Sequence, residues 1–190
     1  MTDRLTKQDW IRHGLRTLAA DGANAIKIAP MATKLKVSRG SFYWHFRDVA
    51  DFRSQILQSW QEHSTAQVIQ QIDAEAEPDR LKQLLERAFG GERRKGSDQD
   101  SSWSVERAIR SWAEEDASVS ELVASVDASR VSYIVKLLTL SRLDARSALP
   151  RATFLYWAYL GQYFVLDQTQ RSISKRSLSD IADLFFSNRS

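Results

Sequence analysis

One stretch of ten residues constrains the fold of this chain more than any other segment: Val37-Ser38-Arg39-Gly40-Ser41-Phe42-Tyr43-Trp44-His45-Phe46. Phe42 and Phe46 are four residues apart, so a helix places both rings on one face, where they can be buried. Ser38 stands just before the helical pattern and predicts an N-cap, because its hydroxyl can accept a hydrogen bond from a free backbone N–H of the first turn. The stretch therefore predicts a short helix with a buried apolar edge and an outer face of polar and aromatic side chains.

The outer face of this helix has the chemistry of a surface that binds DNA. Arginine and serine bond phosphates or base edges, tyrosine and histidine bond phosphate oxygens, and aromatic rings contact thymine methyl groups. Apolar spacing predicts a second short helix over residues 28–36, and Lys36-Val37-Ser38 forms the turn between the two. Two helices joined by a tight turn make a helix-turn-helix, whose second helix enters the major groove. Aromatic runs at helical spacing more often belong to a core, so it is this context that favours DNA binding.

Residues 6–58 resemble the DNA-binding domain of the TetR family of bacterial transcriptional regulators. The resemblance runs from the amphipathic segment 10–18 through Asp21-Gly22 to the ten-residue stretch, and it covers a little under a third of the chain. It implies an all-α fold of about nine helices, with a DNA-binding domain at 1–48 and a ligand-binding and dimerisation domain at 49–190. The implied function is a DNA-binding transcriptional regulator, usually a repressor, that binds a palindromic operator as a homodimer and responds to a small molecule.

The DNA-contacting residues are expected on the outer face of the helix and among the basic side chains beside it. The predicted contacts of the helix are Arg39, Ser41, Tyr43, Trp44 and His45, and the predicted phosphate anchors are Lys27, Arg47 and Arg53. The chain departs from the family pattern at Ala29, where a threonine or arginine often bonds a phosphate, and at Val49, where a lysine is usual. Lys36 replaces a common glycine in the turn. We therefore expect a redistributed set of phosphate anchors and a turn of different shape.

The rest of the chain repeats the helical period and has no run that alternates as a strand does, which predicts the all-α class. Further helices are expected at about 49–74, 81–89, 102–115, 119–140, 148–168 and 178–186, with a charged, glycine-rich loop at 90–100.

The segment 154–165 is apolar almost all the way round and should be buried on more than one side. We expect one of its sides to meet a second subunit, with Ala158 and Gly161 allowing close approach. The resemblance implies a homodimer through the last two long helices, about 148–168 and 178–187. Two recognition helices about 34–36 Å apart would then read successive major grooves.

Several classes of function are disfavoured by composition. The chain has no cysteine, three scattered histidines and too few glycines for a phosphate-binding loop, so we expect no enzyme, no metal and no cofactor. No run approaches the roughly 18 apolar residues of a membrane span, and the N-terminus lacks an apolar signal core, which predicts a cytoplasmic protein without a membrane partner. Residues 1–60 carry ten Lys or Arg and five Asp or Glu, and this basic excess coincides with the predicted DNA-binding segment.

A ligand pocket in the second domain is expected from the resemblance and is compatible with composition. Its candidate residues are Trp60, His63, Trp103, Arg107, Trp112, Tyr133 and Tyr156, although each one alone is more often a core or surface residue. Arg107 and His63 would favour an anionic or hydrogen-bonding ligand. Two alternatives remain open: a helical small-molecule-binding or adaptor protein that has lost specific DNA binding, and an all-α enzyme for which no residue set can be named.

Overall fold

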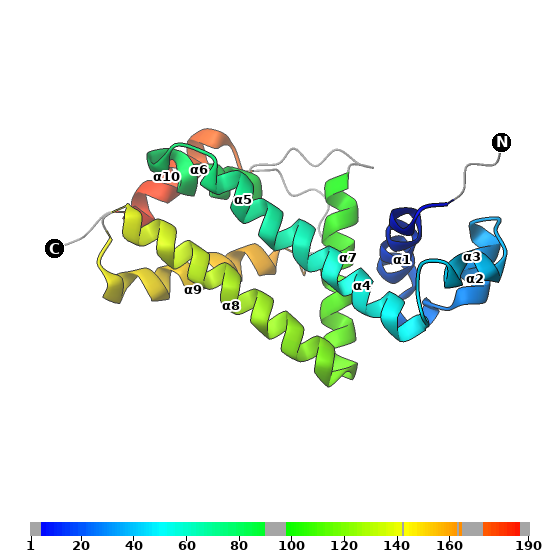
Figure 1. Ribbon diagram of the computed structural model, residues 1–190. Helices are drawn as coiled ribbons and strands as arrows, with labels where there is room; N and C mark the ends of the chain where they lie inside the picture. The colour runs from blue at the N-terminus through cyan, green and yellow to red at the C-terminus, as the bar shows by residue number, and fades with distance from the viewer. Residues whose placement is uncertain (1–4, 90–97, 142, 163, 165–172, 187–190) are drawn as a thin grey trace. The chain divides into compact units, whose positions relative to one another are not determined.

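The structure of the protein is a computed structural model that describes residues 5–89, 98–141, 143–162, 164 and 173–186 (Figure 1). Every regular element within these residues is a helix, so the all-α prediction is confirmed. The chain packs as two compact units. The first unit comprises Met1–Ser64 and Asp98–Val123, and the second comprises Thr65–Ser97 and Ala124–Ser190. The predicted division at residue 48 concerns function and does not coincide with these packing units, and it stays a prediction.

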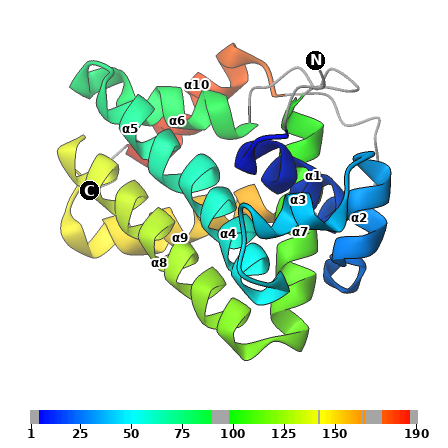
Figure 2. The same cartoon turned by 45° about the vertical axis from the view of Figure 1, so that its right-hand side comes forward.

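The first unit contains the predicted helix-turn-helix. Its elements are α1 (Lys7–Asp21), η1 (Ala23–Ala25), α2 (Ile28–Lys34), α3 (Arg39–Tyr43), α4 (Val49–Gln61), α7 (Asp98–Glu115) and the beginning of α8 (Ala117–Leu140). α2 and α3 lie side by side (Figure 2). α1 packs against both α4 and α7. The helix expected over 28–36 ends two residues early, and α7 begins at Asp98, inside the loop expected at 90–100; residues 90–97 lie outside the described part of the chain.

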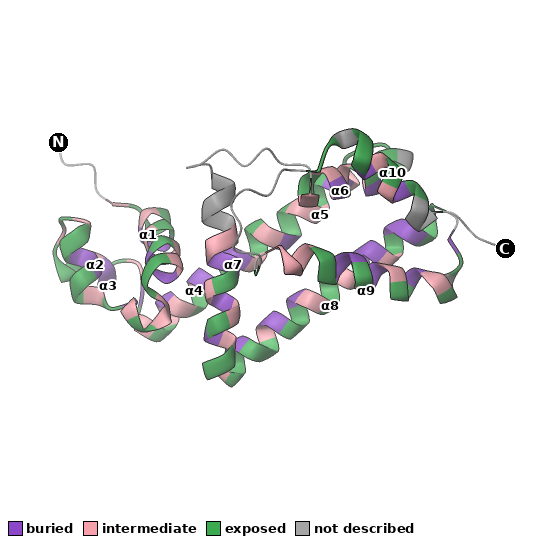
Figure 3. Cartoon of the chain, turned by 180° about the vertical axis from the view of Figure 1, so that it is seen from behind, coloured by how far each residue is buried: buried purple, intermediate pink, exposed green. Residues whose placement is uncertain are grey.

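The second unit is built from the C-terminal helices. Its elements are α5 (Gln67–Asp73), η3 (Glu77–Asp79), α6 (Arg80–Phe89), the remainder of α8, α9 (Ala145–Gly161) and α10 (Lys175–Phe186). The core of this unit includes Leu85, Leu137, Leu138 and Leu155, and buried and exposed residues alternate along α8 and α9 (Figure 3). α9 ends at Gly161, before the predicted end at residue 168; residue 163 and residues 165–168 lie outside the described part of the chain.

Side-chain caps and a glycine close several helix ends, and the predicted cap at Ser38 is the exception. Thr6 and Asp9 form a capping box, and Gly22 ends α1 with φ 78°, a conformation that glycine adopts without strain. Asp48 caps α4 by accepting the Asp51 N–H at 2.8 Å. Ser38 occupies the N-cap position of α3, but the prediction that its hydroxyl caps the helix was wrong. Its backbone carbonyl instead accepts the Ser41 N–H at 3.0 Å, which satisfies a donor of the first turn.

The single helix expected over 49–74 is interrupted by a π-helical turn, η2 (Glu62–Ala66). Within this region the Nδ1–H of His63 donates to the carbonyl of Ser59 at 2.7 Å. That carbonyl would accept the His63 backbone N–H in a regular α-helix, so the ring competes for the acceptor that the α-helical pattern needs. The apolar periodicity on either side remains helical, which is why the sequence alone predicted one continuous element.

Gly14 lies where α1 packs tightly against α4. A Cβ atom at this position would lie 2.5 Å from Ile56 Cδ1 and 2.8 Å from Phe52 Cζ. Gly14→Ala is therefore expected to lower the free energy of unfolding by about 1–2 kcal/mol, because overpacking outweighs the roughly 1 kcal/mol by which alanine favours a helix. Urea denaturation measures the change. Gly40→Ala is the matched control, since its Cβ would meet only Ser38 Oγ, at 3.6 Å. An equally stable or stabilised Gly14→Ala protein would contradict the tight approach.

Candidate DNA-binding surface and ligand-binding residues

The inner edge of α3 is fixed by an aromatic cluster. Phe42 is fully buried, with its ring centroid 5.4 Å from those of Trp10 and Phe52 and 5.0 Å from that of Phe46. Phe46 is also buried and lies 4.7 Å from Phe52. Most of these pairs are edge-to-face, an arrangement that stabilises aromatic packing beyond burial of area. The cluster joins α1, α3 and α4, so a helix of five residues, too short to be stable alone, acquires a defined orientation.

The turn before α3 has the backbone that glycine would favour. Lys36 has φ 57°, the only positive φ outside glycine among the described residues. The N–H of Lys36 donates to the Thr33 carbonyl at 3.1 Å, and that of Val37 donates to the Ala32 carbonyl at 3.0 Å. This left-handed conformation costs a residue with a Cβ roughly 1–2 kcal/mol. Lys36 thus reproduces the glycine-type conformation in spite of its side chain, whereas the sequence had suggested a turn of different shape.

The outer face of α3 and the residues after it carry exposed side chains. Tyr43 is 59% exposed and Trp44 is 74% exposed, although the fold buries most large hydrophobic side chains. Arg39 is also exposed, and Ser41 is half-buried on the same short helix. His45 is half-buried, and its Nε2–H donates to the carbonyl of Leu5 at 3.1 Å. Arg39, Tyr43 and Trp44 are thus exposed to solvent, Ser41 is half-buried beside them, and His45 bonds the carbonyl of Leu5.

The three predicted phosphate anchors are placed differently from one another. Lys27 is exposed at the N-cap position of α2. Arg47 precedes α4, and its side chain is 85% exposed with only a 4.0 Å ion pair to Asp51. Arg53 points into the first unit, where its Nη2 donates to the carbonyl of Ala23 at 3.1 Å. Lys27 and Arg47 can reach a phosphate without losing an interior contact, whereas Arg53 cannot.

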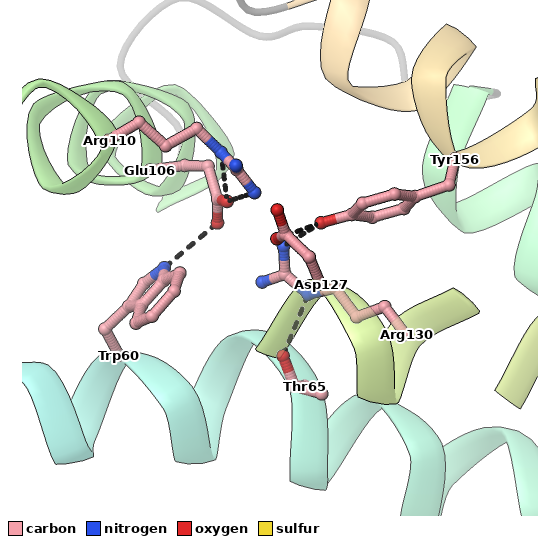
Figure 4. Close-up of polar contacts among 7 residues, drawn as sticks. All are labelled: Trp60, Thr65, Glu106, Arg110, Asp127, Arg130 and Tyr156. Carbon is pink, nitrogen blue, oxygen red and sulfur yellow. Dashed lines mark hydrogen bonds and ion pairs between the residues drawn. The ribbon is translucent and has the colours of Figure 1, made fainter. Parts of the chain in front are cut away.

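Among the predicted ligand-binding residues of the first unit, Trp60 is part of a buried polar cluster. Its indole Nε1–H donates to Glu106 Oε2 at 3.0 Å, and Arg110 Nη2 lies 2.9 Å from Glu106 Oε1 (Figure 4). Glu106 is 2% exposed, and the side chain of Arg110 is 16% exposed. The carboxylate is thus stabilised by a cation and an N–H donor, as a buried charge requires.

The other four candidates of this unit are not gathered at one point. His63 is exposed and bonded to its own helix, and Trp103 is half-buried. Arg107 and Trp112 both line a hollow of about 360 Å³ on the face formed by the end of α1, η1 and α7. The ring of Trp112 is 8% exposed, whereas Arg107 is exposed. The structure therefore brings Arg107 and Trp112 to one cavity and leaves His63 outside its lining.

The two candidates of the second unit, Tyr156 and Tyr133, form hydrogen bonds with different sets of residues. Tyr156 donates its hydroxyl to Asp127 Oδ1 at 2.6 Å and accepts from Arg130 Nη1 at 3.3 Å; Arg130 Nε also donates to Thr65 Oγ1 at 2.9 Å (Figure 4). Burial raises the pKa of the Tyr156 phenol, although the Arg130 charge opposes this, so the hydroxyl stays a donor. Tyr133 donates to Asp73 at 2.9 Å, and burial raises its pKa as well.

Four charged residues of these clusters were not identified from the sequence: Glu106, Arg110, Asp127 and Arg130. Glu106 and Arg110 are spaced by four residues on α7, and Asp127 and Arg130 by three on α8. Such spacing usually marks a solvent-exposed ion pair, and only the apolar neighbours of α8 hinted at burial. The described residues hold no group of three or more His, Cys, Asp or Glu side chains that could bind a metal ion. Among the described helices, none combines the length and hydropathy that a membrane span requires.

Comparison with known proteins identifies the fold. No protein-family model and no curated protein matches the chain, but solved structures do. A candidate transcriptional regulator from Saccharomonospora viridis, in complex with choline, is 15% identical over 96% of each chain with a TM-score of 0.73. A candidate TetR-family regulator from Rhodococcus sp. is 18% identical over 98% of this chain and 100% of its own (TM-score 0.60), and one from Mesorhizobium loti is 19% identical over 95% and 92% (TM-score 0.63). The chain has the fold of TetR-family transcriptional regulators.

Proposed function

We propose that the protein is a DNA-binding transcriptional regulator, in which α3 enters the major groove. The observation that carries this proposal is the opposite burial of neighbouring rings at residues 42–46, in α3 and directly after it. Phe42 and Phe46 are locked into the aromatic cluster, while Tyr43 and Trp44 project from the same few residues with 59% and 74% of their surface exposed. Rings that stay largely in water add little burial to the fold, and their exposure suits a surface that contacts base edges and phosphates.

A homodimer is proposed from the exposed apolar face of α9. Leu149, Phe154 and Trp157 are 55%, 59% and 67% exposed, and their helical positions place them on one side of α9. Ala152 and Leu155 are buried on the opposite side. A contiguous exposed apolar face of this kind usually marks a protein interface. A second copy on this face would pair two α3 helices for the half-sites of a palindromic operator.

A small-molecule effector completes the proposal, and its effect would be a shift between two conformations of the dimer. One conformation holds the α3 helices at operator spacing, and the effector binds better to the other, so operator affinity falls by the difference in affinity. In the first unit, Trp60 with Glu106 supplies an aromatic ring beside a carboxylate. Because Arg110 already neutralises this carboxylate, we propose a hydrogen-bonding ligand. Choline, which is present in the structure of one neighbour, is a cation and is therefore the contrasting compound to test. The regulator would act, by repression, in the cytoplasm of a bacterium.

The alternative is a helical small-molecule-binding or adaptor protein without specific DNA binding. It is favoured by one observation, the commitment of Arg53 to the interior, which adds to the absence of phosphate-binding side chains at Ala29 and Val49. Fluorescence anisotropy of labelled DNA from upstream of the protein's own gene separates the two proposals. The regulator should bind this DNA saturably, outcompete random DNA and weaken as salt rises. If binding is no better than to random DNA, and selection from a random library also yields no preferred sequence, the alternative is favoured.

Tyr43→Ala is expected to weaken operator binding by about tenfold or more without unfolding the protein. A lost base or phosphate contact costs roughly 1–3 kcal/mol, and the exposed ring contributes little to the core. The measurement is operator anisotropy alongside urea denaturation. Ser54→Ala is a control, because Ser54 is exposed on α4 and outside the predicted contacts. Full operator affinity in a folded Tyr43→Ala protein would remove this residue from the binding surface.

Trp157→Glu is expected to dissociate the dimer at micromolar concentration, since it places a charge at the centre of an apolar interface. Sedimentation velocity measures the mass, and Ser132→Glu, on the exposed side of α8, is the control for added charge. A Trp157→Glu protein that sediments as the wild type does would show that this face is not the interface.

A further inference from the structure

Arg53 connects three elements of the first unit. It lies in the second turn of α4, and its Nη2 donates to the carbonyl of Ala23 in η1 at 3.1 Å. The same guanidinium lies over the ring of Trp112 in α7, 5.8 Å from its centroid. Its Nε atom is buried and has no hydrogen-bond partner. One side chain therefore links the beginning of α4 to η1 and to α7.

These contacts are specific to arginine. The planar guanidinium can stack on an indole while one of its N–H groups bonds a carbonyl, whereas a lysine ammonium is a point charge that cannot do both in this geometry. A phosphate contact would require the guanidinium to leave the Trp112 ring and the Ala23 carbonyl. Arg47 has no such cost, because its side chain is 85% exposed. The two arginines, six residues apart, therefore differ: Arg47 is free to contact phosphate, and Arg53 is engaged in interior contacts.

Arg53 is next to Phe52 in α4, so the contacts of Arg53 can affect the position of the DNA-binding helices. Phe52 packs into the aromatic cluster, with its ring 5.4 Å from Phe42 and 4.7 Å from Phe46. Two successive residues of α4 thus contact different elements. Phe52 packs against the inner edge of α3, and Arg53 contacts η1 and α7. A displacement of α7 or η1 therefore changes the support of the helix that positions α3.

We propose that Arg53 is a positioning residue that fixes α4 between α7 and the DNA-binding helices, and that it does not contact phosphate. The effect of Arg53 on DNA binding rests on the proposed function, whereas its role in fixing α4 does not. The hollow beside α1 shares two partners of Arg53, because Ala23 and Trp112 both line it. A molecule bound in this hollow would displace Ala23 or Trp112 and so disturb the contacts of Arg53. The hollow is therefore where binding beside α7 can change operator affinity.

The first test needs no DNA. A double-mutant cycle with Arg53→Met and Trp112→Leu measures the coupling between the two side chains in urea denaturation. We expect a coupling of about three- to tenfold in the unfolding equilibrium constant, the size of a partly desolvated cation–π contact. Arg47→Met with Trp112→Leu is the control cycle and should show none. Additive effects in the Arg53 cycle would overturn the proposal whether or not the protein binds DNA.

The second test separates positioning from phosphate binding by charge-preserving substitution. Arg53→Lys keeps the charge but loses the stacked geometry, so we expect reduced operator affinity with an unchanged salt dependence. Arg47→Lys should bind almost as the wild type does, and Arg47→Met should reduce the slope of log affinity against log salt by about 1. If Arg53→Lys binds normally and Arg53→Met reduces the slope by about 1, Arg53 contacts phosphate and the proposal fails.

The third test uses the absence of cysteine from the chain. Ser111→Cys introduces a thiol among the residues that line the hollow, and alkylating it with a benzyl maleimide fills the space beside Trp112. Operator affinity should fall severalfold after alkylation when Arg53 is present and change little in the Arg53→Met background. Glu114→Cys, exposed on α7 but outside the hollow lining, is the control and should respond in neither background. If alkylation lowers operator affinity equally with and without Arg53, the effect of α7 does not pass through Arg53 and the proposal fails.

Discussion

Replacing Phe42 with alanine is expected to lower the free energy of unfolding by about 3–5 kcal/mol, the range for large aromatic residues removed from a packed core. Phe42 is fully buried and touches Trp10, Phe46 and Phe52, whose rings cannot all move inward because they belong to three different segments. A cavity will therefore remain where the ring was, and the lost dispersion contacts add to the lost burial.

Urea or thermal denaturation, at a fixed protein concentration, measures the effect of Phe42→Ala. Tyr43→Ala is the matched control, because it removes an aromatic ring of similar size one residue away that is 59% exposed. Its cost in stability should stay at about 1 kcal/mol, because its exposed ring has an edge-to-face contact with Phe42, at 5.4 Å between centroids. The two substitutions thus test the two sides of α3 separately. Phe42→Ala should lower stability, and Tyr43→Ala should lower operator affinity. A Phe42→Ala loss below about 1 kcal/mol would show that the cluster does not hold α3.

Replacing Glu106 with alanine is expected to cost about 3 kcal/mol, because it removes the carboxylate that the largely buried Arg110 guanidinium and the Trp60 N–H both bond. Glu106 is 2% exposed and accepts from both Arg110 and Trp60, so the Trp60 N–H also loses its acceptor. Denaturation measures the loss.

Two variants control for the Glu106 experiment. Glu114→Ala removes an exposed carboxylate from the same helix and should change stability by no more than about 0.5 kcal/mol. Glu106→Gln keeps an acceptor for the Trp60 N–H but removes the charge, so it should fall between the wild type and Glu106→Ala. If Glu106→Ala is as stable as Glu114→Ala, the ion pair contributes nothing to the fold.

Local features of the fold could be predicted from short stretches. The capping box of Thr6 and Asp9, the glycine stop at Gly22 and the Asp48 cap all depend on side chains within four residues of the groups they bond. The burial of Phe42 and Phe46 followed from their spacing on a helix. The π-helical turn η2 could not be predicted, because it involves a contest between the His63 ring and its own backbone for one carbonyl. Helical periodicity does not report such a contest.

The candidate site was predictable only in part. Tyr43 and Trp44 were identified because no core position on α3 remained for them once Phe42 and Phe46 were placed. Arg53 has the same charge as Arg47 and lies six residues away, and nothing in the sequence indicates that one guanidinium meets Ala23 and Trp112 while the other meets solvent. The domain division, the DNA contacts and the ligand residues stay predictions until binding is measured.

The sequence by itself determined the all-α class, the helix-turn-helix and the inner and outer sides of α3, because periodicity and capping act within a few residues. Only the tertiary structure decided which charged residues are buried, because burial depends on segments that are distant in the chain. Glu106 and Arg110 look like a surface ion pair until Trp60, 46 residues earlier, donates to the carboxylate. Arg53 looks like a phosphate anchor until η1 and α7 surround its guanidinium. A charge pattern along one helix cannot say which of its sides another helix covers.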